Sequence, residues 1–148
     1  MDASTRYIGP TRLDSVMNRF FNALPKLGIS VAGSRLLAVR GRKSGEWRTT
    51  MVNLLTTSDG QRFLVAPRGH TQWVRNLRVA GTGELRLGRR VETFSATEVP
   101  DADKIPVLRE YLQRWGWEVG KFFDGVTKDS TDDELAAIAP GFPVFALA

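Results

Sequence analysis

The sequence predicts a mainly β domain with added helices, in which short antiparallel strands form a closed or partly closed barrel. Short apolar segments recur between residues 35 and 99, and turn signals such as Asp59-Gly60 separate them. Residues 35–66 show no alternation of strands with helices, which argues against a parallel sheet. The length of 148 residues, 42% of them apolar, suits a single domain over residues 1–148. The expected strands are 35–40, 47–56, 62–66, 84–87, 91–99 and 142–147.

Helical spacing of apolar residues is clearest near the N-terminus. From Leu13 to Leu24 apolar side chains recur every three or four positions, and Pro25 and Gly28 end the pattern. We therefore expect an N-terminal helical arm within about residues 1–28. Further helices are expected over 70–79, 103–114 and 115–123, and after an N-cap at Thr131.

The composition excludes several kinds of chemistry. The chain has no cysteine and one histidine, His70. Disulfides, thiolate metal sites, cysteine nucleophiles and histidine-based metal clusters are therefore excluded, and no metal is expected. No apolar run approaches the roughly 20 residues of a membrane-spanning helix. No secretory signal is evident, so a cytoplasmic location is expected.

The charge is concentrated in the middle of the chain. The net charge is +5, but residues 35–90 carry twelve basic and three acidic residues, whereas residues 91–148 carry five basic and eleven acidic ones. Such a localised positive field suits an anionic partner. An anionic cofactor, nucleic acid and a lipid head group are all candidates.

The most informative segment is the basic loop between the first two expected strands. Gly41 and Gly45 bracket Arg42, Lys43 and Ser44. Cations, a hydroxyl and freed backbone N–H groups at such a tip can hold a phosphate or carboxylate. The alternative is an ordinary hairpin turn whose charges face water.

Several further segments follow this loop in a characteristic order. They are Arg48, Asp59-Gly60, the strand Phe63-Leu64-Val65-Ala66, Gly69, Trp73-Val74-Arg75-Asn76-Leu77 and a hairpin over 85–99. In this order and spacing they resemble the deazaflavin-dependent nitroreductase family, the A-type oxidoreductases that depend on coenzyme F-420. The resemblance covers residues 33–100 well and the C-terminal third loosely. Segments 122–125 and 140–145 lean toward a subgroup linked with lipid-like ligands.

The resemblance implies a split β-barrel like that of the FMN-binding reductases, and an 8-hydroxy-5-deazaflavin cofactor, coenzyme F-420, with FMN as the runner-up. Such a cofactor carries the hydride chemistry, so the protein needs no cysteine or metal of its own. The resemblance assigns the cofactor's phosphate and tail to the basic loop. Its ring would lie along the second strand and over the turn after the third, with backbone N–H groups of Ala66, Arg68 and Gly69 as donors. The implied cofactor residues are Arg42, Lys43, Ser44, Gly45, Arg48, Thr49, Thr50, Met51, Val65, Ala66, Pro67, Arg68, Gly69, Trp73, Asn76 and Leu77. The family usually has proline where Met51 stands.

The substrate side is expected in the C-terminal third. Relatives that reduce nitroimidazoles carry several tyrosines there, whereas this chain has only Tyr111. Trp115, Trp117 and Phe122 would instead form an apolar, flat-walled pocket for an enone, a quinone or a lipid-like acceptor. The proton donor is left open between Tyr111, His70 and water.

The leading function is hydride transfer from the reduced deazaflavin to an activated C=C, quinone or nitro acceptor. The alternatives are a non-catalytic protein that binds the cofactor or a fatty acid, and a nucleic-acid-binding domain. The sequence has no RRM, KH or zinc-finger signature, so nucleic acid is not the expected partner. A homodimer and a peripheral membrane contact are left open.

Overall fold

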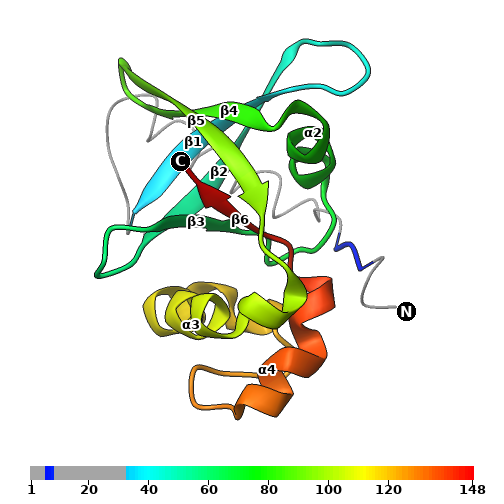
Figure 1. The fold of residues 1–148 in the computed structure, drawn as a ribbon, viewed down its shortest axis with the longest axis vertical. Coiled ribbons are helices and arrows are strands. Elements are labelled where there is room, and N and C mark those ends of the chain that lie inside the picture. Colours follow the sequence, from blue (N-terminus) through cyan, green and yellow to red (C-terminus); the bar gives the residue numbers. More distant parts are fainter. Residues whose placement is uncertain (1–5, 9–32) are drawn as a thin grey trace.

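The computed structural model describes residues 6–8 and 33–148, and six antiparallel strands close into a barrel above a pair of helices (Figure 1). The strands are β1 (Ser34–Arg40), β2 (Trp47–Thr56), β3 (Arg62–Val65), β4 (Thr82–Leu87), β5 (Arg90–Glu98) and β6 (Val144–Leu147). They pair in the order β1-β2-β3-β6-β5-β4, and β1 also pairs with β4. The predicted mainly β barrel with helices is confirmed. Apart from residues 6–8, the expected N-terminal arm lies outside the described residues.

Each strand lies within two residues of its expected position because the turn signals are local. At the β2–β3 hairpin, Gly60 has a φ of 84°, a conformation that glycine adopts without strain. Its N–H bonds the carbonyl of Thr57 at 3.0 Å, which closes the turn. Pro143 precedes β6 rather than interrupting it, as its missing N–H requires.

Three α-helices and three short 3-10 turns complete the described chain. They are α2 (Gln72–Ala80), α3 (Ile105–Val119), α4 (Asp132–Ile138), η2 (Asp101–Asp103), η3 (Gly120–Phe122) and η4 (Ala139–Gly141). Thr131 caps α4 as expected, because its hydroxyl accepts the N–H of Glu134 at 3.2 Å. None of these helices has both the length and the apolar character needed to cross a membrane.

The expectation of two separate helical pieces over 103–114 and 115–123 is wrong. One helix, α3, runs through Gly116 without a break. Glycine within a helix costs only about 1 kcal/mol relative to alanine. The buried series Tyr111, Trp115 and Val119, at intervals of four residues, keeps one face of the helix on the core.

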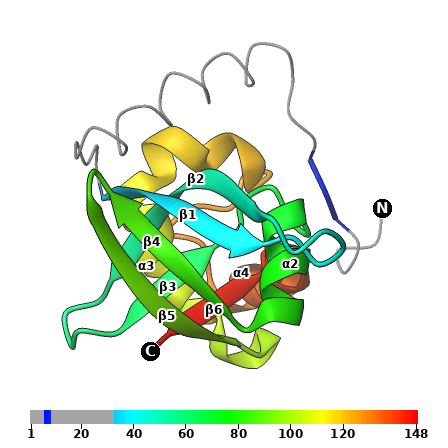
Figure 2. The ribbon, with the colours of Figure 1, turned by 90° about the horizontal axis from the view of Figure 1, so that it is seen from above.

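The core has two parts, and the part inside the barrel positions α2. Inside the barrel, Leu37, Leu64 and Phe94 pack with Val74 and Leu77 of α2. Below the barrel, buried side chains of α3 and α4 pack against β3 and β6. Seen from above, α2 lies next to the loop between β1 and β2 (Figure 2). The basic loop is therefore held against the N-terminal half of α2.

Candidate functional site

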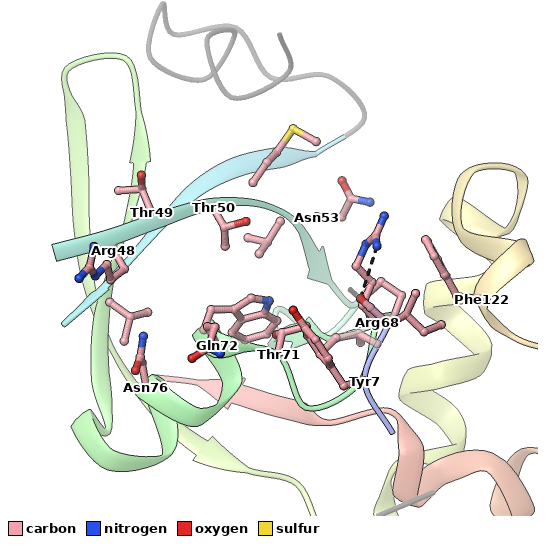
Figure 3. Close-up of a pocket in the computed structure, with 18 of the residues that line it drawn as sticks. Tyr7, Arg48, Thr49, Thr50, Asn53, Arg68, Thr71, Gln72, Asn76 and Phe122 are labelled. Atoms are coloured by element: carbon pink, nitrogen blue, oxygen red, sulfur yellow. Dashed lines mark hydrogen bonds between the residues drawn. The ribbon is translucent and has the colours of Figure 1, made fainter. Parts of the chain in front are cut away.

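A pocket of about 900 Å³ lies between β2 and the segment that runs from β3 into α2 (Figure 3). Arg48, Thr49, Thr50 and Asn53 lie along β2, and α2 begins on the opposite side. The basic loop borders one end of the pocket. Residues 7 and 8 and the end of α3 border the other end.

The basic loop is tied to α2 by Asn76, a buried residue that is 4% exposed. The Asn76 side-chain oxygen accepts the backbone N–H of Arg42 at 3.1 Å and the Arg42 guanidinium at 2.8 Å. The guanidinium also donates to Gln72 at 2.9 Å. Arg42 is thereby held at the pocket edge, whereas Lys43 and Ser44 extend from the exposed tip of the loop. Two cations and a hydroxyl converge on this end of the pocket.

The half of β2 nearest the loop has a strand partner on one side only. β1 pairs with seven residues of β2, whereas β3 pairs with only the last three. The N–H of Leu54 bonds the carbonyl of Gly33 at 3.1 Å, so alternate residues from Leu54 back toward the loop direct their backbone groups at β1. Thr49, Met51 and Asn53 direct theirs the other way, and all three line the pocket. At Thr49 and Met51 the pocket thus contains backbone donors and acceptors that no strand of the described chain pairs, whereas at Asn53 the edge already meets the end of β3.

The N-terminus of α2 faces this edge across the pocket. Intrahelical bonding begins where the N–H of Arg75 bonds the carbonyl of Thr71 at 3.1 Å, so the preceding N–H groups have no acceptor within the helix. The Thr71 hydroxyl is buried and has no hydrogen-bond partner among the described residues. A buried polar atom of this kind usually meets a ligand or water. Together with the positive end of the helix dipole, it suits an anionic or carbonyl-bearing ligand.

Aromatic and cationic side chains combine at the opposite end of the pocket. Two cations lie near the Phe122 ring: the Arg68 guanidinium is 4.8 Å from the ring centroid and the Lys121 ammonium is 5.1 Å from it. Tyr7 and Tyr111 also line this end. It therefore offers a flat surface beside positive charge.

Most residues that the sequence assigned to the site do line this pocket. They are Arg42, Lys43, Ser44, Arg48, Thr49, Thr50, Met51, Val65, Ala66, Pro67, Arg68, Trp73, Asn76, Tyr111 and Phe122.

Five assigned residues lie away from the pocket walls. Trp115 is 1% exposed and packs in the core with its ring centroid 5.2 Å from that of Tyr111. Trp117 is 75% exposed, and its indole N–H bonds the Arg114 carbonyl on the surface of α3. The other three are Leu77, Gly45 and Gly69: the leucine is buried in the barrel core, and the glycines form turns with φ of 74° and 90°.

Two of the three expected backbone donors are also already bonded. The N–H of Ala66 bonds the carbonyl of Pro143 at 2.9 Å, and that of Gly69 bonds the carbonyl of Ala66 at 3.1 Å. These bonds shape the turn that leads from β3 to α2. The expectation that both groups would face a ligand is therefore wrong.

Other pocket residues were not identified from the sequence. They are Tyr7, Ile8, Val39, Gly41, Val52, Asn53, Thr71, Gln72, Val119 and Lys121. The sequence could have indicated two of them. Asn53 continues the alternation of β2 from Met51, and Thr71 has the residue type of a helix N-cap. It could not have indicated Tyr7, because the place of Tyr7 in the pocket depends on a contact between residues 62 positions apart in sequence.

The comparison with protein families decides the identity. A model described as F420H2-dependent quinone reductase matches residues 11–117. The chain belongs to this family. F420H2 is reduced coenzyme F-420, so the protein is a deazaflavin-dependent oxidoreductase and coenzyme F-420 is its cofactor. No curated protein sequence matches the chain.

Solved structures share the fold at low sequence identity. A structure described as an F420-H2 dependent reductase is similar with a TM-score of 0.55 and 17% identity, over 78% of this chain and 94% of that one. An FMN-binding protein from Nostoc punctiforme, related to pyridoxamine 5'-phosphate oxidase, gives a TM-score of 0.51 and 14% identity, over 95% of this chain and 80% of that one. A protein of unknown function from Agrobacterium tumefaciens gives 0.56 and 16%, with 86% of this chain covering 53% of its length. This chain thus spans about half of the Agrobacterium protein.

Proposed function

We propose that coenzyme F-420 lies along the unpaired edge of β2, with its phosphate and acidic tail at the basic loop. The edge carries this assignment, because Thr49 and Met51 direct at the cavity backbone groups that no strand of the described chain pairs. A deazaflavin ring has a polar edge of alternating donors and acceptors that can pair with such groups. Thr71 adds a buried hydroxyl with no partner among the described residues, so the residues present fit the cofactor.

The basic loop supplies charge for the anionic part of the cofactor. Arg42 is already oriented by Asn76, so little side-chain freedom is lost when it meets a phosphate. Lys43 makes no hydrogen bond or ion pair within the described chain and remains available to a ligand. Among the residues that the structure describes, the only ion pair of Arg48 is a 3.8 Å contact with Glu46, and both side chains are more than half exposed. Such a contact competes weakly with a ligand phosphate.

The other end of the pocket is the proposed acceptor site, and a quinone is the proposed acceptor. Phe122 places an aromatic ring in the pocket wall, where a planar acceptor ring can pack beside the two cations. Reduced coenzyme F-420, when bound, would supply a hydride, and addition of that hydride to a quinone would leave negative charge on an acceptor oxygen. Arg68 and Lys121 lie at this end and would stabilise that charge. The chain's own contribution is to hold both rings in contact, to exclude water and to neutralise the developing charge.

A fluorescence titration with coenzyme F-420 tests the proposed cofactor orientation. Lys43→Ala should weaken binding about tenfold, equivalent to about 1.4 kcal/mol, without changing the melting temperature, because Lys43 is exposed and makes no bond in the described chain. Arg89→Ala is the matched control, since it also removes one exposed positive charge, in the β4–β5 turn away from the pocket. FMN is titrated in parallel. Equal affinity for the Lys43 variant and the native protein would contradict the assignment of the loop.

A further inference from the structure

A short segment before the barrel, Arg6–Ile8, lies across the turn that precedes α2. The N–H of Ile8 bonds the Arg68 carbonyl and the N–H of His70 bonds the Arg6 carbonyl, each at 2.8 Å. Between these bonds Tyr7 and Gly69 form an antiparallel bridge. We call residues 6–8 the strap.

Gly69 permits this contact. A Cβ atom at Gly69 would lie 2.1 Å from the Arg6 carbonyl oxygen, and its φ of 90° is one that other residues rarely adopt. The glycine of the turn thus has a structural role, which is to let the strap approach the backbone closely.

The Arg6 side chain fixes the strap to the far side of the pocket. Its guanidinium donates to the carbonyl of Phe122 at 2.8 Å and to that of Gly141 at 3.1 Å, and lies 4.2 Å from the centroid of the Phe142 ring. Burial lowers the pKa of Arg6 from its usual value, as expected for a guanidinium partly removed from water. Backbone hydrogen bonds on one side and the Arg6 side chain on the other hold Tyr7 in place.

Tyr7 directs its hydroxyl into the pocket (Figure 3). The hydroxyl makes no hydrogen bond within the described chain, and the residue is 40% exposed. The other of the two tyrosines, Tyr111, also lines the pocket but is 2% exposed and packs among the rings of Trp115 and Phe123. Of the two phenols, that of Tyr7 is the one that both a ligand and solvent can reach.

We propose that Tyr7 hydrogen-bonds a carbonyl oxygen of the acceptor and gives it the proton that accompanies the hydride. This inference rests on the proposed acceptor site. A quinone that takes up one hydride, hence two electrons and one proton, needs one further proton to become a hydroquinone. In this step the Tyr7 O–H bond breaks and a new O–H bond forms on the acceptor. The Tyr7 phenolate then recovers a proton from solvent, which reaches this partly exposed side chain.

Tyr7→Phe tests this role because it removes only the hydroxyl. In single-turnover reduction of a soluble naphthoquinone by protein loaded with reduced coenzyme F-420, the rate should fall about 100-fold, the lower end of the usual contribution of a general acid. The solvent deuterium isotope effect on that step should change, whereas affinity for coenzyme F-420 should stay within twofold of native. A melting curve checks folding of the variant. A structural role alone would leave the isotope effect unaltered.

Two further variants make the test specific. Arg6→Ala releases the anchor, so it should slow the same step, and its effect should not add to that of Tyr7→Phe, because it acts through Tyr7. A native rate of quinone reduction in Tyr7→Phe would overturn the proposal. So would a result in which Tyr111→Phe, and not Tyr7→Phe, loses the solvent deuterium isotope effect. If the native protein failed to bind coenzyme F-420 at all, both the proposed orientation of the cofactor and this inference would fall. Normal binding with unaltered turnover by Tyr7→Phe would overturn only this inference.

Discussion

The hydrogen bonds between Asn76 and Arg42 lead to a prediction in which effects on protein stability and on cofactor affinity can be measured separately. Asn76→Ala removes two hydrogen bonds to a buried oxygen, with lengths of 3.1 and 2.8 Å. At about 1 kcal/mol net for each bond, the free energy of unfolding should fall by about 2 kcal/mol. For a chain of this size that corresponds to a fall of about 4–8 °C in melting temperature. Because Arg42 loses its orientation, affinity for coenzyme F-420 should also fall, by about tenfold or more.

Asn76→Asp is the informative partner of that variant. A carboxylate at this position can still accept both donations from Arg42, so the melting temperature should stay within about 2 °C of native. However, it cancels the Arg42 charge and repels a phosphate, so coenzyme F-420 should bind at least as weakly as to the alanine variant. Calorimetry and fluorescence titration measure the two effects. Native affinity in the aspartate variant would refute the assignment of Arg42 to an anion site, and a native melting temperature in the alanine variant would refute the anchoring of the loop.

Two other substitutions should have opposite effects: one should weaken cofactor binding without lowering stability, and the other should lower stability without weakening binding. Thr71→Val removes a buried hydroxyl that has no partner in the described chain, so the melting temperature should be unchanged or higher. Affinity for coenzyme F-420 should fall about 5- to 10-fold, equivalent to about 1 kcal/mol. Equal affinities of variant and native protein would mean that the hydroxyl contacts no part of the cofactor. Gly83→Ala would bring a Cβ atom to 2.8 Å from the Phe94 ring and 3.0 Å from the Ala38 carbonyl oxygen, so overpacking should cost about 1–3 kcal/mol of stability and leave cofactor affinity unchanged. A native melting temperature for Gly83→Ala would show that the barrel accommodates the added methyl group without strain.

The strands could be predicted from the sequence because their limits are set locally. The β2–β3 hairpin follows from Asp59-Gly60, and the observed β2 coincides with the expected 47–56. The basic loop and β2 supplied much of the candidate site for the same reason: they are continuous in sequence. The family resemblance, confirmed at the level of the F420H2-dependent quinone reductases, added the turn after β3 and the residues of α2.

The errors arose where a side chain's direction depends on tertiary structure. Trp115 and Trp117 were both expected in the pocket, but they lie two residues apart on one helix and therefore face different ways. The spacing of four from Tyr111 to Trp115 could have assigned Trp115 to the core face. By contrast, nothing local in the sequence predicts Tyr7 at the pocket or the burial of the Thr71 hydroxyl, since each results from packing between distant segments.

The same local geometry that shapes the barrel also creates the ligand edge. β3 ends at Val65, and the bonded turn through Ala66 and Gly69 leads the chain into α2 instead of extending the ladder along β2. On the side away from β1, the first half of β2 therefore keeps backbone groups that no described strand pairs, and these would be costly to bury without partners. In the proposed orientation, a heterocycle with its own donors and acceptors would satisfy them, whether its central ring is a flavin or a deazaflavin. Similarity of fold to an FMN-binding protein and membership of an F-420-dependent family are thus compatible with the proposed orientation. In that orientation the edge would recognise what the two ring systems share, and the choice between them would come from the surrounding residues.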